Sequence, residues 1–449
     1  MAGLFLVNVV TCCLLVSVTW AWVNEEIYIG KRGFFSKVGC KLFGSGCSSP
    51  EENVSYGLLF DAGSSSTKLK VYRVTPAEDA SSLPRLDSVF SERFAPGLGD
   101  VQDVRDYLVN ILEVAKEKIP ESKQKETPIY LLATDGLRFL SADDATNLIE
   151  EVKSVFSDSS VSPFIYKPAG VGILSGEEEG VYAWVAANYL LGFFDKNRSE
   201  AKSVGILEMG GGSTQITFQP NSPLYEGEFQ VRVLGQEYEL YVHSYLQFGI
   251  NAINIWVAEV LAEWNPEETT LNNPCMLEDD ETDVQLEDGR ELKLTGTGDP
   301  SECNEILEHI LKPETGYRCE PKPCAIGSVY QPSLEDIQFY ATQGFTYAPK
   351  ELGVVGDDEI LHISELEEAA TEYCGRSLSE AIDAGIKESL ASTTCLMGLY
   401  IPKLFTLSYG FSPDTSDITV TSNIGNDSID WGLGAMVIEL SGNSVRRRR

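Results

Sequence analysis

The sequence predicts an α/β protein, and three observations carry this prediction. Apolar stretches with the composition of strands alternate with amphipathic stretches of helical length, which is typical of layered α/β folds. The chain has 449 residues, enough for two domains of ordinary size with a core each. A strand–turn–strand motif also occurs twice, at an offset of 147 residues (208 − 61).

The elements follow from this alternation in chain order. We expect strands at 56–61, 69–74, 129–133, 204–208 and 215–219, and helices at 103–118, 143–156 and 177–191. The acidic stretch 265–299 has few large apolar residues and is expected to be an irregular loop. Helices resume over 357–389.

The repeated motif pairs "LLFDAGSSSTKLKV" with "GILEMGGGSTQITF". Each copy has an apolar strand, a carboxylate, a turn of small residues and a second strand. The offset places Asp61 on Glu208, Gly63 on Gly210, Ser66 on Ser213 and Thr67 on Thr214. One such turn is more often a plain hairpin, but two matching copies led by carboxylates favour a function.

Turns of small residues can present several backbone N–H groups to an anion and let a phosphate approach the main chain. We therefore expect the two turns to hold the terminal phosphates of a nucleotide, helped by the hydroxyls of Ser64, Ser65, Ser66 and Ser213. The leading carboxylates, Asp61 and Glu208, have the oxygen ligands that Mg²⁺ and Ca²⁺ prefer.

The net charge of −34 fits this interpretation. Such a surface repels nucleic acids and anionic membranes. A phosphate-bearing substrate then needs a local positive device, for which we expect a metal ion and backbone N–H groups.

Three further motifs carry candidate residues, each with a plain structural alternative. "GILSGEEEGVYAWVAANYLLG" places three glutamates at a helix N-terminus, where acidic side chains also favour the helix dipole. "LLATDGLRFL" places Thr134 where a strand ends, which an ordinary turn also explains. "DWGLGAM" contains Trp431, which a core position would also explain.

The N-terminus predicts the secretory pathway. Residues 1–23 carry no charged side chain, residues 4–18 are apolar, and Thr19-Trp20-Ala21 offers a cleavage site, so 1–21 is read as a signal peptide. An uncleaved N-terminal anchor stays open as the alternative. N-glycosylation sequons at Asn53, Asn197 and Asn426 agree with secretion.

The cysteines and histidines add two expectations. Eight cysteines remain beyond the signal, and sequence proximity, which does not prove connectivity, pairs them as Cys40–Cys47, Cys275–Cys303, Cys319–Cys324 and Cys374–Cys395. The chain has only three histidines, so a general base is expected to be a carboxylate.

The motifs in this order resemble the apyrase, or ecto-nucleoside triphosphate diphosphohydrolase, family. "DAGSSSTKLKVY", "ATDGLR", "SGEEEGVYAWVAANYLLG", "LEMGGGSTQITF" and "WGLGA" look like its five conserved regions. "YVHSYLQFG" and the spacings Cys319–Cys324 and Cys374–Cys395 fit as well. The resemblance covers nearly the whole chain after the signal.

The resemblance implies two RNase H-like, actin-like lobes with the site in the cleft between them: 55–175 plus 421–440 as lobe I and 176–420 as lobe II. The segment 22–54 would precede them and 441–449 would be a basic, solvated tail. It also implies a secreted enzyme, expected as a monomer without nucleic-acid or, after signal cleavage, membrane partners. This enzyme would hydrolyse nucleoside tri- and diphosphates to monophosphates with Ca²⁺ or Mg²⁺.

Residue roles carried over from the family are expectations of the same kind. Glu179 matches the general base, and Ser213 and Gln215 match the residues that position the attacking water. The phosphate-binding set is Ser64, Ser65, Ser66, Thr134, Gly210, Gly211, Gly212 and Ser213. The metal set, acting mostly through water, is Asp61, Thr134, Glu208 and Trp431. Phe345, Tyr347 and Tyr409 fall where the family stacks the nucleobase.

Two positions depart from the family pattern, which usually has Asp where Glu208 stands and Ala where Asp135 stands. These changes keep open a catalytically weak nucleotide-binding protein, and the expected fold keeps open a sugar-kinase-like phosphotransferase. The secretory signal opposes the kinase, because ATP is scarce outside cells.

Overall fold

The computed structural model describes residues 54–79, 81–138, 140–196, 202–286, 288–312 and 320–447. The predicted signal peptide, the Cys40–Cys47 pair, Cys319 and the sequons at Asn53 and Asn197 lie outside these residues. Residues 55–449 form one compact unit, so the lobe boundaries stay a prediction.

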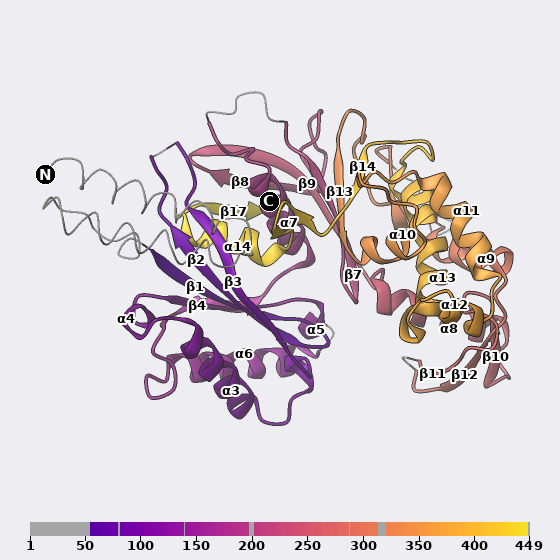
Figure 1. The fold of residues 1–449 in the computed structure, drawn as a ribbon, viewed down its shortest axis with the longest axis horizontal. Coiled ribbons are helices and arrows are strands. Elements are labelled where there is room, and N and C mark those ends of the chain that lie inside the picture. Colours follow the sequence, from indigo (N-terminus) through magenta and orange to yellow (C-terminus); the bar gives the residue numbers. More distant parts are fainter. Residues whose placement is uncertain are drawn as a thin grey trace, which may run out of the picture. The chain divides into compact units, whose positions relative to one another are not determined.

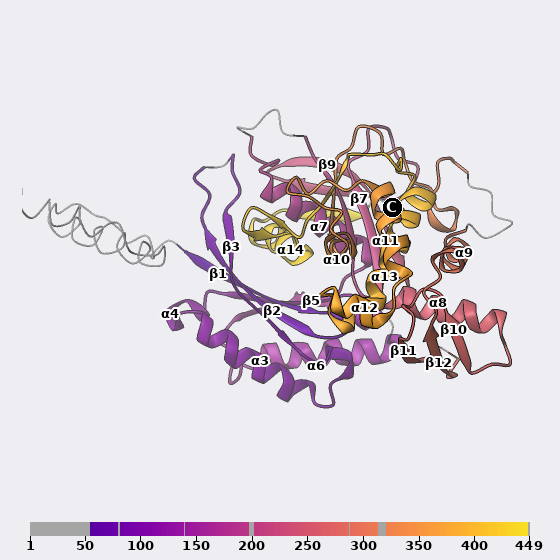
Figure 2. The ribbon, with the colours of Figure 1, turned by 45° about the vertical axis from the view of Figure 1, so that its right-hand side comes forward.

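The first sheet has five strands in the order β3-β2-β1-β4-β5 (Figures 1 and 2). β1 pairs antiparallel with β2 and parallel with β4, and β4 pairs parallel with β5. This mixed order positions the β1–β2 turn beside the end of β4. Its strands are β1 (Ser55–Ala62), β2 (Thr67–Thr75), β3 (Arg85–Phe94), β4 (Pro128–Ala133) and β5 (Ile165–Ile173).

The second sheet repeats this plan around the second copy of the motif. Its order is β14-β13-β6-β7-β9-β8-β17, with β6 antiparallel to β7 and parallel to β13. Its strands are β6 (Gly205–Met209), β7 (Ser213–Phe218), β8 (Glu228–Val233), β9 (Gln236–Leu246), β13 (Phe339–Gln343), β14 (Ile418–Val420) and β17 (Ser444–Arg447). The sequence repeat is therefore a repeat of sheet topology.

Helices cover the sheets in layers, as Figures 1 and 2 show. α3 (Val104–Lys118) and α6 (Ala142–Ser157) pack on the first sheet, while α7 (Gly176–Leu190) and α14 (Trp431–Leu440) lie between the sheets and share one core with both. The outer face of the second sheet is covered by α8 (Ile250–Trp264), α9 (Pro300–Leu311), α10 (Tyr347–Glu351), α11 (Ile363–Cys374), α12 (Leu378–Asp383) and α13 (Glu388–Lys403). Two short helices, α4 (Glu121–Gln124) and α5 (Asp135–Arg138), flank β4.

Most of the expected elements are confirmed, and two expectations are wrong. The stretch 265–299 holds a three-stranded sheet of β10 (Thr270–Asn273), β11 (Glu281–Gln285) and β12 (Glu291–Gly296). Its acidic residues lie mostly on exposed positions, which hid the strand pattern. The expected solvated tail also contributes β17, which pairs antiparallel with β8.

Disulfides join Cys275 to Cys303 and Cys374 to Cys395, as proximity predicted. Glu388–Tyr409, which is α13 and the π-helical turn that follows, is the one helix in the described part of the chain long and apolar enough to cross a membrane. However, 67% of its apolar window is buried, and it belongs to the core of the outer helical layer.

Candidate active site

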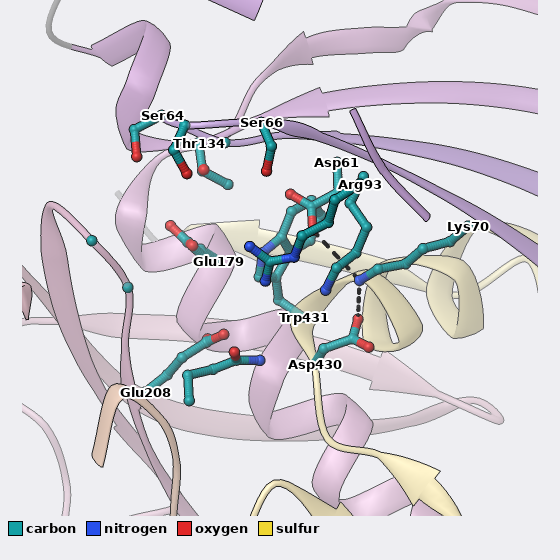
Figure 3. Close-up of a pocket in the computed structure, with 16 residues that line it drawn as sticks. Asp61, Ser64, Ser66, Lys70, Arg93, Thr134, Glu179, Glu208, Asp430 and Trp431 are labelled. Carbon is teal, nitrogen blue, oxygen red and sulfur yellow. Dashed lines mark hydrogen bonds and ion pairs between the residues drawn. The ribbon is translucent and has the colours of Figure 1, made fainter. Parts of the chain in front are cut away.

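One open cavity of about 670 Å³ brings together most of the predicted site residues (Figure 3). It lies between the β1–β2 turn of the first sheet and the β6–β7 turn of the second. The predicted residues that line it are Asp61, Ser64, Ser65, Ser66, Thr134, Glu179, Glu208, Gly210, Gly211 and Trp431. Gly212 lines an adjoining cavity, together with Ser64 and Gly211.

The two turns have the same local structure. The Gly63 N–H donates to the Ser66 carbonyl at 3.0 Å, and the Gly210 N–H donates to the Ser213 carbonyl at 2.9 Å. The leading carboxylates differ in what faces them: Asp61 is in register with Lys68, and Glu208 with Gln215. The two turns therefore share one backbone conformation, whereas the side chains in register with their carboxylates differ.

The three consecutive glutamates of α7 divide into different roles. Glu178 closes a capping box with Ser175, whose hydroxyl accepts from the Glu178 N–H at 3.1 Å. Glu179, one residue later, is 8% exposed and reaches into the cavity. The plain interpretation of an acidic helix N-terminus thus accounts for Glu178 and leaves Glu179 to the site.

Arg138 connects Glu179 to the second turn. Its two terminal nitrogens lie 3.2 Å from Glu179 Oε2, and Nη2 also donates to Ser213 Oγ at 3.1 Å. Gln215 Nε2 donates to the same Ser213 oxygen at 2.9 Å. Ser213 and Gln215 are each 1% exposed, so this network lies directly behind the cavity wall.

Thr134 follows a strand of the first sheet, and Trp431 begins a helix that lies between the two sheets. Thr134 directly follows β4, and its N–H donates to the Ala62 carbonyl at 3.1 Å, which ties it to the first turn. Trp431 is the first residue of α14 and 5% exposed. Both residues line the cavity, and Trp431 also belongs to the core shared by the two sheets, so the core position that the sequence left open for it is confirmed beside its place at the cavity.

A buried ammonium separates two of the carboxylates. Lys70 Nζ lies 2.7 Å from Asp430 Oδ1 and 3.5 Å from Asp61 Oδ2. Burial alone would lower the pKa of Lys70, but the two carboxylates raise it above its ordinary value. Burial would raise the pKa of Asp430, but Lys70 holds it below the usual range, while for Asp61 burial prevails and the pKa is raised.

Glu208 has no ion pair with a basic side chain among the residues that the structure describes. It is 3% exposed, and its Oε2 has no hydrogen-bond partner among the described residues. Burial, reinforced by the charges of Glu179, Asp430 and Asp61, raises the pKa of Glu208 well above its ordinary value. A buried polar atom without a partner is costly in an apo protein and suits a site whose ligand supplies the partner.

The residues present fit a divalent cation that keeps most of its ligands from water and phosphate. Asp61, Glu208 and Thr134, which carry carboxylate and hydroxyl oxygens, line one cavity, and Glu208 keeps a buried oxygen without a hydrogen-bond partner among the described residues. No group of three His, Cys, Asp or Glu side chains within metal-binding distance occurs in the described part of the chain.

Sequence reasoning missed the basic side chains and Asp430. Lys68, Lys70 and Arg93 line the cavity. Basic side chains therefore supply positive charge there, in addition to the metal ion and backbone N–H groups that the sequence led us to expect. Lys68 and Lys70 alternate along β2 directly after the serine turn, and this spacing was a usable signal. Burial and the neighbouring Lys70 lower the pKa of Lys68.

Two of the three aromatic residues expected at the nucleobase are buried elsewhere, which corrects that assignment. Phe345 is fully buried and lies 5.1 Å from the Phe405 ring, and Tyr409 is 2% exposed in the same core. The 3₁₀ turn that follows β13 directs Phe345 into this core. Only Tyr347 is exposed, at 55%, and none of the three lines the cavity.

Comparison with known proteins agrees with this geometry. A model of the GDA1/CD39 (nucleoside phosphatase) family matches residues 48–448. Ectonucleoside triphosphate diphosphohydrolase 1 of Mus musculus is 29% identical over 423 residues, covering 86% of this chain and 81% of that protein. A protein named "Probable guanosine-diphosphatase" in Aspergillus fumigatus is 29% identical over 451 residues, covering 89% of this chain and 88% of that protein.

The solved structure titled as nucleoside triphosphate hydrolases from Neospora caninum matches with a TM-score of 0.63 at 15% identity. It covers 91% of this chain and 96% of that chain. At that identity the likeness is one of fold, and with the repeated sheet order it confirms the expected α/β protein of two RNase H-like lobes.

Proposed function

Because the chain belongs to the GDA1/CD39 (nucleoside phosphatase) family, whose matched relatives are nucleotide phosphohydrolases, we propose that Glu179 activates the attacking water in a metal-dependent hydrolysis. The products are nucleoside monophosphates and inorganic phosphate. The observation that supports this most is that Glu179 and both small-residue turns line one cavity.

In this proposal the two turns hold the terminal phosphates from opposite sides. Backbone N–H groups and the hydroxyls of Ser64, Ser65 and Ser66 donate to phosphate oxygens. Lys68 and Arg93, which have no ion pair within the described ranges, add charge at the same wall. These donors offset the charge that develops on the phosphoryl oxygens in the transition state.

The water is held by the network behind the cavity wall. Ser213 and Gln215 orient it, and Glu179 accepts its proton as the oxygen–phosphorus bond forms. The bond between the terminal phosphorus and the bridging oxygen breaks, and the electron pair leaves with the shorter nucleotide. Arg138 keeps the Glu179 carboxylate in place through its two contacts of 3.2 Å.

A bound Mg²⁺ or Ca²⁺ would neutralise phosphate oxygens and make the phosphorus more electrophilic. Asp61, Glu208, Thr134 and Trp431 would hold it, mostly through water. Secretion, and a monomeric state with no nucleic-acid or membrane partner, complete the proposal. Secretion is supported by the N-terminal pattern of residues 1–21 and by the relatives named as ectonucleoside triphosphate diphosphohydrolases.

The test is phosphate release by Glu179→Gln. Loss of the base should lower kcat by at least about 100-fold, because general-base catalysis contributes roughly 10²–10⁴. Nucleotide binding and cooperative thermal unfolding should persist. Release is measured from ATP, ADP, GDP and UDP with Ca²⁺ and with Mg²⁺, which also reveals the preferred substrate and cation.

Glu177→Gln is the matched control, because Glu177 lies in the same helical turn and does not line the cavity. It should keep wild-type turnover. If Glu179→Gln also keeps wild-type turnover, Glu179 is not the base.

A further inference from the structure

Lys70 is a cation built into the wall of the active-site cavity. It lies on β2, is 2% exposed, and contacts Asp430 at 2.7 Å and Asp61 at 3.5 Å (Figure 3). A buried ammonium is tolerated only when it is paired and hydrogen-bonded, and here two carboxylates from distant parts of the chain meet it.

The start of α14 is shaped around this ammonium. Asp430 caps the helix by accepting the Leu433 N–H at 3.0 Å, so its carboxylate is held in place independently of Lys70. A Cβ at Gly432 would lie 2.9 Å from both Lys70 Nζ and Asp430 Oδ1. Lys70 Nζ also lies 5.7 Å from the centroid of the Trp431 ring.

The position of the ammonium is one that a divalent cation would favour. Two carboxylates held on either side of one point supply the oxygen ligands that Mg²⁺ and Ca²⁺ prefer. Lys70 occupies that point, and it offsets acidic charge that would otherwise attract a free cation. Arg138 does the same at Glu179, which leaves Glu208 as the lining carboxylate without an ion pair among the described residues.

We propose that Lys70 is a resident counter-ion that keeps a divalent cation out of the nucleotide-free site, so that the cation enters only together with the polyphosphate. This inference rests on the proposed function, because it concerns the same cavity. The phosphates supply the negative charge and oxygen ligands that the nucleotide-free site lacks for binding the cation. Lys70 is therefore a specificity-determining residue for the metal–nucleotide complex.

The experiment is calorimetric titration of Ca²⁺, and separately Mg²⁺, into the full chain without nucleotide. Wild-type protein should show no saturable binding below about 1 mM. Lys70→Met should bind one cation at least about tenfold more tightly, the size of effect that neighbouring groups have on metal affinity. Lys293→Met, which removes an exposed lysine paired with Glu281 at 2.7 Å, should behave as wild type.

A second variant distinguishes the specific role of Lys70 from a general effect of removing a positive charge near buried carboxylates. Lys70→Met/Asp430→Asn removes the ammonium and one of its two carboxylates together, and the asparagine oxygen can still cap α14. This double variant should show no gain in cation binding. A gain equal to that of Lys70→Met would overturn the proposal.

The wild-type titration tests the idea even if Lys70→Met does not fold, since saturable binding of free cation by wild-type protein contradicts it. A folded Lys70→Met without a new cation site contradicts it as well. None of these readouts needs turnover. If no nucleotide releases phosphate, the proposed function fails while the titrations still decide the role of Lys70.

Discussion

The β1–β2 and β6–β7 hairpins have the same backbone and opposite chemistry. Both turns are closed by the same hydrogen bond, and both present a carboxylate to one cavity. In the first hairpin Asp61 faces Lys68 and touches Lys70. In the second, Glu208 faces Gln215 and keeps an oxygen without a hydrogen-bond partner within the described residues.

This difference shows how the two copies of one motif can take different roles in the same site. The first hairpin supplies hydroxyls and basic side chains, which suit binding of phosphate. The second supplies an uncompensated carboxylate and the Ser213–Gln215 pair, which suit the metal and the water. Substitutions made in matched pairs can test this division.

The largest effect is expected from substituting the glycine that packs against the backbone of each turn, which is Gly249 for the β6–β7 turn and Gly136 for the β1–β2 turn. A Cβ on Gly249 would lie 2.5 Å from Ser213 N and 2.6 Å from Gly210 O, and a Cβ on Gly136 would lie 2.5 Å from Ser64 Cα. Backbone atoms must move in both cases. Gly249→Ala should lower kcat by about 100-fold, since small misplacements of water-positioning groups cost that much.

Gly136→Ala should instead raise KM, by about tenfold, because it displaces donors to phosphate. Steady-state phosphate release gives both constants. Gly99→Ala is the control, because a Cβ there meets nothing closer than 3.6 Å. Identical changes in kcat and KM for the two variants would contradict a division of labour between the turns.

The sequence predicted the hairpins and the site better than it predicted their charges. Carboxylates, small residues and apolar strands are local patterns, and their repetition pointed to one cavity containing Asp61 and Glu208, to which the family resemblance added Glu179. The contact of Lys70 with Asp430 joins residues 360 positions apart, and no local pattern encodes it. The basic wall was therefore missed although Lys68 and Lys70 stand directly after the serine turn.

The prediction that three aromatic residues stack on the nucleobase was wrong for a different reason. Phe345 and Tyr409 have the right residue type for stacking, but residue type does not decide which side of a strand end a ring takes. The turn after β13 places Phe345 against Phe405, where core packing competes with ligand binding and prevails. Within 265–299, hydrophobic alternation is absent from β11, which is exposed along most of its length, while β10 and β12 do alternate between exposed and buried positions but are only four and six residues long.

A smaller effect is expected when the two carboxylates are neutralised in turn. Glu208→Gln should raise the Ca²⁺ or Mg²⁺ concentration needed for half-maximal phosphate release by about 10–100-fold, as for other groups that hold a metal through water. Asp61→Asn should raise it less, because Lys70 already offsets the Asp61 charge. Glu237→Gln, an exposed glutamate paired with Arg232, is the control. Equal shifts for Asp61→Asn and Glu208→Gln would show that Lys70 does not distinguish the hairpins.

The smallest effect concerns stability without ligand. A carboxyl group whose pKa is higher in the folded protein keeps its proton at pH values where the unfolded chain has lost it, so stability falls as pH rises through that interval. For Glu208 the interval begins near the ordinary value of 4.5 and extends well above it. Glu208→Gln escapes this loss, so its melting temperature should exceed that of wild type by a few degrees at about pH 8 and by less at about pH 5.

Asp61→Asn should show a weaker trend of the same sign, because burial raises the pKa of Asp61 against the opposing effect of Lys70. Thermal unfolding in chelator, without nucleotide, measures both variants against wild type across this pH range. A gain for Glu208→Gln that does not change with pH would mean that the substitution improves packing and relieves no buried charge. The contrast between the hairpins would then lie in their ligands alone and not in the energetics of the empty site.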